Sequence, residues 1–250
     1  MIWGSFGNIH MITLFLAVLL LVGLYYLLKN KSMKVQRAVL GVLSFSGIAA
    51  IVFNLLAWGS PLEYLPLHLC SITAILLPIG VLTRSRRICN LLLLWCLGAV
   101  FALVVNTAQA DYELVSWTFT FYYFPHVLEF GIPILMFKLG LVKKDYRCIG
   151  STLLITLMIY SVVHTLNVLL NGYFESHQIL DHSGQLIQVN YMFSVIPENP
   201  LLGLFYQLIP MPYWYLYLAV PIIAVYLVAI YIPEFVGEKV SDKGKKLVLW

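Results

Sequence analysis

Residues 9–28 read IHMITLFLAVLLLVGLYYLL, twenty residues without one Asp, Glu, Lys or Arg. An α-helix rises about 1.5 Å per residue, so roughly 20 apolar residues cross the hydrocarbon core of a bilayer. The stretch therefore predicts a transmembrane helix. Residues 1–10, at its start, carry no Lys or Arg, and no cleavage site of small residues follows, so we do not expect a signal peptide.

The rest of the chain has the same apolar character. Hydrophobic residues make up 61% of the 250 residues, charged residues make up 10%, and the mean hydropathy is +0.90. Soluble domains carry about 25% charged residues, so this chain has too few to cover a water-facing surface. Seven spans are predicted, with approximate bounds 9–28, 37–58, 65–83, 88–107, 118–139, 148–170 and 213–236. We expect residues 1–250 to form one all-α transmembrane domain, a bundle of seven transmembrane helices.

The basic residues predict how the bundle is oriented. All 15 Lys and Arg fall in three alternate loops and the C-terminal tail: Lys29, Lys31, Lys34 and Arg37; Arg84, Arg86 and Arg87; Lys138, Lys143, Lys144 and Arg147; Lys239, Lys243, Lys245 and Lys246. Short loops rich in Lys and Arg stay in the cytoplasm. The N-terminus is therefore expected outside and the C-terminus in the cytoplasm, with residues 171–212 as an extracytoplasmic loop. This segregation also explains the net charge of +4 without a nucleic-acid partner.

Several polar side chains fall inside the predicted spans at a similar depth. Ionisable groups within a membrane are costly and are candidates for function. The predicted topology places the following residues in the outer half of the bilayer, on four different helices: His68, Cys70, Asn106, His126, Glu129, His164 and Asn167. We expect them to contribute to one site toward the outer leaflet.

The residue types at this site favour nucleophilic chemistry. Pro66 is typical of a helix start, so Cys70 is expected near a helix N-terminus, where the dipole favours a thiolate. His126 would take the thiol proton, and Glu129, three residues later on the same helical face, would orient or charge the imidazole. His164 and Asn167 share a face of their helix and would donate hydrogen bonds to an oxyanion.

Other interpretations of the same residues stay open. Cys70 is two residues from His68, so the two side chains point to different helical faces, and a lone Cys or His is often a packed structural group. The four cysteines form no CxxC pattern. A zinc hydrolase would take His68, His126 and His164 as ligands, with Cys70 or Glu129, although no HExxH or HxxxH spacing is present. A transporter or receptor is the non-enzymatic alternative.

The motifs of the chain resemble those of the YwaF family of bacterial integral membrane proteins. The matching pieces are residues 65–72 (LPLHLCSI), the start of the fifth span around His126, residues 190–193 (NYMF) and residues 210–215 (PMPYWY), in the family's order. The family is related to eukaryotic transmembrane phospholipid acyltransferases that depend on a cysteine. The resemblance therefore implies a multi-pass protein of a bacterial plasma membrane.

The resemblance also implies an activity. It assigns Cys70 as the nucleophile and His126 as the base of an enzyme that moves a fatty acyl chain from a phospholipid to a lysolipid or another amphiphilic acceptor. The fatty acyl chain would be carried as a thioester on Cys70, and no cofactor or metal would take part. Membrane phospholipids and lysolipids are then the expected partners. The other candidate residues are expected to support the site or to bind substrate: His68, Glu129, His164, Asn167 and Asn190.

Overall fold

The computed structural model describes residues 2–4, 6–58, 61–104, 111–197, 200–208, 220–221, 223–232 and 235–236. Its α-helices are α1 (Asn8–Leu28), α2 (Met33–Ser44), α3 (Ser46–Ala57), α4 (Leu69–Thr83), α5 (Arg86–Val104), α6 (Trp117–Lys138), α7 (Ile149–Ser176) and α8 (Pro200–Leu208). Two short strands, β1 (Ile2–Trp3) and β2 (Tyr112–Glu113), pair antiparallel. Three 3-10 turns complete the described elements: η1 (Pro61–Tyr64), η2 (Tyr146–Cys148) and η3 (Tyr191–Phe193).

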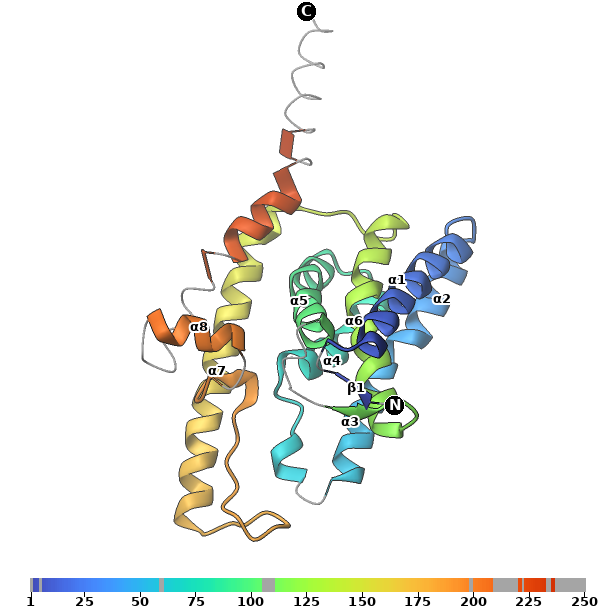
Figure 1. The fold of residues 1–250 in the computed structure, drawn as a ribbon. Helices are drawn as coiled ribbons and strands as arrows, with labels where there is room; N and C mark the ends of the chain where they lie inside the picture. Colours follow the sequence, from blue (N-terminus) through green and yellow to red (C-terminus); the bar gives the residue numbers. More distant parts are fainter. Residues whose placement is uncertain are drawn as a thin grey trace, which may run out of the picture.

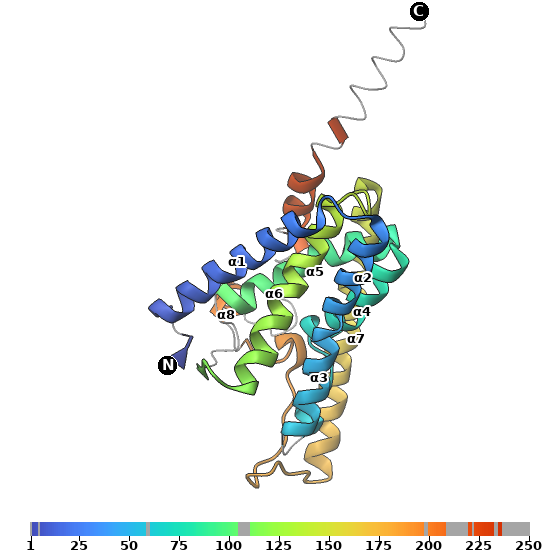
Figure 2. The same ribbon diagram turned by 90° about the vertical axis from the view of Figure 1, so that its right-hand side faces the viewer.

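Helix α6 lies at the centre of the bundle. It packs against α3, α4 and α5, and α1 crosses it on the outside (Figure 1). The buried core joins α4, α5 and α6 through residues such as Leu77, Leu92 and Ile132. Helix α7 lies apart from α6 and reaches the bundle through α5 (Figure 1). In the view of Figure 2 it lies behind the other helices. The packing therefore makes α3, α4 and α6 a contiguous group.

Helix α4 is shorter than the predicted span 65–83. It begins at Leu69, because His68 has extended backbone angles (φ −72°, ψ 153°) and serves as the N-cap. Pro66 was expected in the first helical turn, but it lies before the helix. A residue that precedes proline is driven toward extended conformations, which favours a non-helical Leu65. Cys70 is consequently the second residue of α4.

The predicted span 37–58 is a helix with an interruption. It extends from Met33 to Ala57 and is divided at Phe45 into α2 and α3. The hydroxyl of Ser44 donates to the carbonyl of Gly41 at 2.6 Å, and such a bond competes with the helical ladder. The division gives α3 its own start beside α4 and α6, with Gly47 in its first turn.

The links that carry basic residues meet at one end of the bundle. Arg37 at the start of α2 donates to the carbonyl of Leu82 near the end of α4, at 2.5 Å. Arg86 at the start of α5 forms an ion pair with Asp145 in the link between α6 and α7, at 2.8 Å. The opposite end holds the starts of α4 and α6 and the β1–β2 pair. The bundle is thus polarised along its length, with its basic links together.

Four described helices are long and apolar enough to cross a membrane: Asn8–Leu28, Met33–Ala57, Arg86–Val104 and Tyr146–Ser176. Two apolar helices are shorter, Leu69–Thr83 and Ile223–Ile232. The second of these belongs to the predicted span 213–236, the remainder of which lies largely outside the described residues. Residues 105–107 of the span 88–107, which include Asn106, also lie outside them, as does the motif at 210–215. Seven crossings and the orientation of the termini stay predictions.

Candidate functional site

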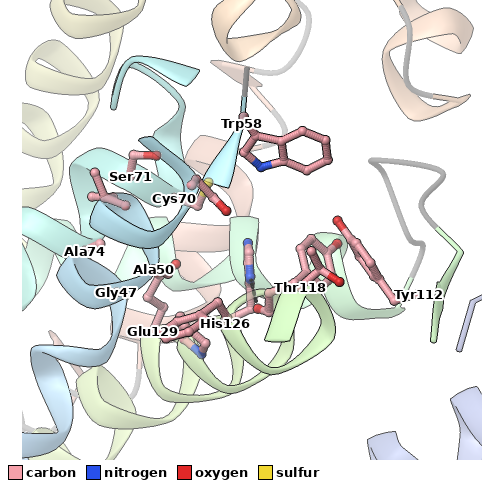
Figure 3. Close-up of a pocket in the computed structure, with 15 residues that line it drawn as sticks. Gly47, Ala50, Trp58, Cys70, Ser71, Ala74, Tyr112, Thr118, His126 and Glu129 are labelled. Atoms are coloured by element: carbon pink, nitrogen blue, oxygen red, sulfur yellow. Dashed lines mark hydrogen bonds between the residues drawn. The ribbon is translucent and has the colours of Figure 1, made fainter. Parts of the chain in front are cut away.

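A cavity that is partly open to its surroundings lies between α3, α4 and α6 (Figure 3). Its wall near the starts of α4 and α6 is aromatic, and its deeper part is formed by small residues and one carboxyl group. The described lining residues are Gly47, Ala50, Ile51, Asn54, Trp58, Cys70, Ser71, Ala74, Tyr112, Thr118, Phe121, Tyr122, Pro125, His126 and Glu129. Three of the residues singled out in the sequence, Cys70, His126 and Glu129, therefore lie around one space.

Cys70 reaches the cavity from the first turn of α4. The first N–H groups of a helix have no partner within it, so the backbone there offers free donors to a negative charge. The hydroxyl and the backbone N–H of Ser71 both interact with the sulfur of Cys70. The side chain of Cys70 is partly exposed, to the cavity. The thiol thus lies beside hydrogen-bond donors and within reach of a ligand.

His126 reaches the same space from α6. Its Nδ1 lies 2.6 Å from the carbonyl oxygen of Tyr122. A carbonyl only accepts hydrogen bonds, so Nδ1 carries the proton and Nε2 of the neutral ring keeps a lone pair. Glu129 was expected to orient this imidazole, whereas the hydrogen bond that fixes the ring is made by Tyr122. His126 is therefore in the tautomer that a base acting through Nε2 requires.

Glu129 lies one level deeper in the cavity than Cys70. Helices α4 and α6 run in the same direction, and Ala74 and Glu129 follow Cys70 and His126 by about one turn each. A Cβ atom added to Gly47 of α3 would lie 2.5 Å from Cβ of Ala74 and 3.0 Å from Oε1 of Glu129. The three helices therefore approach one another closely at this level. The carboxyl group of Glu129 forms part of the floor of the cavity.

Aromatic rings form the upper wall. Tyr112 from β2 and Tyr122 from α6 have ring centroids 4.9 Å apart, and the hydroxyl of Tyr122 donates to the carbonyl of Ala102 at 2.9 Å. Burial raises the pKa of the Tyr112 hydroxyl to about 12, with a further contribution from Tyr64, so Tyr112 is neutral at physiological pH. The wall is thus uncharged and holds Tyr122, whose carbonyl positions His126.

The family model that describes the TMEM164 family matches residues 5–231. The chain belongs to the TMEM164 family. These are transmembrane proteins, and the four long apolar helices agree with this, so the chain is a multi-pass membrane protein. No curated protein and no solved structure matches the chain. The relationship to YwaF proteins and to acyltransferases stays a prediction beside this match.

In this TMEM164 chain the N-terminal strand supports the aromatic wall. Trp3 is fully buried, and its ring lies 6.1 Å from that of Tyr112 and 5.5 Å from that of Tyr122. Its Nε1 donates to Oγ1 of Thr13 in α1 at 2.9 Å. Neither Trp3 nor Tyr112 is recognisable from the sequence as part of the site. Their pairing across β1 and β2 joins distant segments, and two-residue strands leave no periodic signal in a sequence.

His68 and Asn167 lie in a second polar cluster, outside the cavity lining. The side chains of Asn167 and Ser194 are both fully buried. Nδ2 of Asn167 donates to the carbonyl of Tyr191 and to Oγ of Ser194, each at 2.8 Å, and its Oδ1 accepts from the N–H of Tyr191 at 3.1 Å. Nδ1 of His68 accepts from the N–H of Met192 at 3.3 Å. The cluster therefore fixes the turn η3 against α7 and the start of α4.

His164 and Asn190 complete this cluster. Nδ1 of His164 lies 3.2 Å from Oγ of Ser194. Oδ1 of Asn190 accepts from the N–H groups of Val195 and Ile196, at 3.0 and 3.2 Å. The structure thus separates four residues expected at the site from Cys70 and His126: His68, His164, Asn167 and Asn190. Their described contacts hold residues 191–196 next to the start of α4.

The zinc-site alternative needed His68, His126 and His164 as neighbouring ligands. His126 lines the cavity, whereas His68 and His164 contact the segment 192–194. Within the described part of the chain, no group of three or more His, Cys, Asp and Glu side chains is arranged to hold a metal ion. The histidines on which that alternative depends are therefore not brought together.

Proposed function

We propose that this protein is a membrane-embedded acyltransferase that moves a fatty acyl chain from a phospholipid to a lysolipid or another amphiphilic acceptor. The observation that carries the proposal is that Cys70 and His126 line one cavity, with Nδ1 of His126 at the carbonyl of Tyr122. A cysteine becomes a competent nucleophile when a neighbouring base removes its proton. The motif at residues 65–72 adds the likeness to cysteine-dependent enzymes.

The first half of the proposed reaction forms a thioester. Nε2 of His126 takes the proton of the Cys70 thiol, and the thiolate attacks the carbonyl carbon of a phospholipid ester. The carbonyl oxygen becomes negatively charged, next to the N–H groups of the first turn of α4, which have no partner within the helical ladder. When the intermediate collapses, the bond to the glycerol oxygen breaks. The leaving oxygen takes the proton back from His126, and a lysolipid departs.

The second half transfers the acyl chain. His126 takes the proton of an acceptor hydroxyl, whose oxygen attacks the thioester carbonyl. The new ester leaves, and the Cys70 thiolate recovers the proton from His126. In the predicted topology the cavity lies in the outer half of the bilayer, where little water is available. Exclusion of water protects a reactive thioester, which favours transfer to a lipid over hydrolysis.

Intact-protein mass spectrometry tests the proposal directly. Purified protein is incubated with defined phospholipids without an acceptor, as wild type, Cys70→Ala and Cys96→Ala. Cys96 is a matched control because it is buried in α5. We expect a fatty-acyl mass increment, removed by hydroxylamine, in the wild type and in Cys96→Ala only. An increment that persists in Cys70→Ala, or lipid turnover without any adduct, would contradict the proposed mechanism.

A further inference from the structure

Glu129 is the most deeply buried ionisable group of the cavity floor. Its side chain is 4% exposed, and its Oε2 has no hydrogen-bond partner among the described residues. Buried polar atoms are nearly always paired, so an orphan atom calls for an explanation. Glu129 also lines the cavity into which Cys70 and His126 project (Figure 3). The free oxygen therefore lies where a bound ligand provides the missing partner.

The surroundings of Glu129 disfavour a carboxylate. No Lys or Arg is among the described residues that line the cavity. The titratable groups that face this space are Cys70 from α4, Tyr112 from β2, and Tyr122 and His126 from α6, while α3 contributes none. His126 uses its Nδ1 proton on the carbonyl of Tyr122. A buried carboxyl group without a cationic partner stays protonated, because an unpaired charge is too costly there.

A protonated carboxyl group is a hydrogen-bond donor. The carboxyl group of Glu129 also lies close to Cys70. Ala74 and Glu129 both approach Gly47, and Ala74 follows Cys70 by four residues, about one helical turn. One helical turn rises about 5.4 Å, a separation that the carbonyl group of an ester bound at the thiol and one hydrogen bond from Glu129 span together. Neutral carboxylic acids in apolar sites act in this way in other enzymes, where they donate to a developing oxyanion.

We propose that Glu129 is a further catalytic residue, a neutral carboxylic acid that donates a hydrogen bond to the carbonyl oxygen of the acyl ester attacked by Cys70. The inference rests on the proposed function and adds a side-chain donor to the backbone donors at the start of α4. When the thiolate attacks, the electron pair of the C=O bond moves to its oxygen, and the Glu129 O–H stabilises that charge without transferring its proton. Collapse restores the C=O bond and leaves Glu129 protonated.

Paired substitutions separate a neutral donor from a required charge. Glu129→Gln keeps the shape and a hydrogen-bond donor, whereas Glu129→Leu keeps the approximate size and removes hydrogen bonding. We expect Glu129→Gln to form the Cys70 thioester within about tenfold of the wild-type rate. Glu129→Leu is expected to be slower by about 10²–10³-fold, the effect of losing one oxyanion donor. Glu175→Gln on the exposed end of α7 is the control at wild-type rate.

Infrared spectroscopy provides a readout that does not depend on turnover. The wild type at neutral pH is expected to show the carbonyl-stretch band of a protonated carboxylic acid. That band should disappear in Glu129→Gln and remain in Glu175→Gln. If Glu129→Leu does not fold, the infrared band and the Glu129→Gln rate still decide the question.

The outcomes distinguish this inference from the proposed function. A wild type without a Cys70 adduct would overturn the acyltransferase and, with it, the role of Glu129. A normal adduct in the wild type and an unchanged rate in Glu129→Leu would overturn the role of Glu129 alone. So would a Glu129→Gln variant as slow as Glu129→Leu, or the absence of the protonated-acid band from the wild type, since either result would mean that a carboxylate is present or required.

Discussion

Nδ1 of His126 is bound to the carbonyl oxygen of Tyr122, one turn earlier in the same helix, at 2.6 Å. The backbone of α6 thus performs the orienting role for which many histidine sites use a carboxylate. Glu129 is therefore not needed to orient the imidazole of His126. The rigidity of the arrangement comes from Tyr122 itself, because its hydroxyl is held by the carbonyl of Ala102 in α5.

Replacing the proposed base should slow thioester formation. His126→Gln keeps a polar side chain of similar length but removes the ring nitrogen to which the proposal assigns the thiol proton. We expect a loss of about 10²–10⁴-fold at pH 7, the usual contribution of a general base. The loss should shrink as the pH rises, because hydroxide then ionises the thiol. Stopped reactions analysed by intact-mass spectrometry measure the rate. A His126→Gln protein acylated at the wild-type rate at pH 7 would exclude His126 as the base.

Gly47→Ala should destabilise the junction of α3, α4 and α6. The added methyl group would lie 2.5 Å from Cβ of Ala74, where it has no room. Overpacking of this kind costs about 1–3 kcal/mol. The matched control is Gly172→Ala in α7, where no atom lies within 4 Å of the added Cβ, and where alanine in place of helical glycine stabilises by about 0.5–1 kcal/mol. Thermal unfolding in detergent should therefore shift in opposite directions.

Ala74→Gly tests whether that clash is the cause. In the double variant Gly47→Ala/Ala74→Gly the methyl group changes sides and the close contact is relieved. We expect the double variant to recover part of the stability that Gly47→Ala loses, measured by the same unfolding assay. No recovery would mean that Gly47 is needed for another reason, such as its approach to Glu129.

Asn167→Ala should weaken the fold more than it changes the chemistry. The substitution removes three buried hydrogen bonds and leaves the peptide groups of Tyr191 without a partner. A buried group left unpaired costs about 1–3 kcal/mol. Thr165→Ala, on an exposed part of the same helix, is the control. A stable Asn167→Ala protein with a thioester rate reduced 10²-fold or more would instead support the oxyanion role expected from the sequence.

Asp145 provides a pH-dependent contribution to stability. Partial burial acts to raise the pKa of its carboxyl, but the hydrogen bond and charge of Arg86 and the N–H of Arg147 hold the pKa below its usual range. A carboxyl whose pKa is lower in the folded state stabilises the fold above its unfolded pKa of about 3.9. That contribution is lost as the pH falls through the folded pKa.

Asp145→Asn should therefore be less stable than the wild type at pH 7, and the difference should close as the pH drops below about 4. Unfolding temperatures across this pH range measure it. High salt should have a modest effect, because the partner Arg86 is 60% exposed and exposed charges are screened. A difference between the two proteins that does not vary with pH would contradict the role of the carboxylate charge.

The sequence predicted helices best where an apolar run coincides with a whole helix. The span 9–28 corresponds to α1 (Asn8–Leu28), and the span 118–139 corresponds to α6 (Trp117–Lys138). The prediction was less accurate at helix ends. Leu65 to His68 are apolar enough to continue a helix but lie outside α4. Helix α7 continues to Ser176, past the predicted end at residue 170. The prediction ended with the apolar run, whereas a helix can continue through polar residues.

The site shows a different limit. The prediction assigned His68, His164 and Asn167 to the same site as Cys70 and His126 because all of them lie at a similar depth in the predicted membrane. Depth does not specify the direction in which a side chain points from its helix. Helix α7 turns Asn167 toward residues 191–194, and the loop that binds it follows α7 in the chain. Only helices that pack side by side, such as α4 and α6, place their polar groups in one cavity.

The pairing of β1 with β2 also determines when the cavity is completed. Trp3 and Thr13 precede the other residues of the aromatic wall along the chain, and Tyr123, whose hydroxyl donates to the carbonyl of Thr13, follows Thr13 by 110 residues. Contacts at such separation form late, because a long intervening chain must first be ordered. Until α6 arrives, the indole of Trp3 has no aromatic wall to join, and His126 has not yet been synthesised. The wall of the cavity is therefore complete only after the segments around Trp3, Tyr112 and Tyr122 have met, and a nascent chain has no assembled cavity before that.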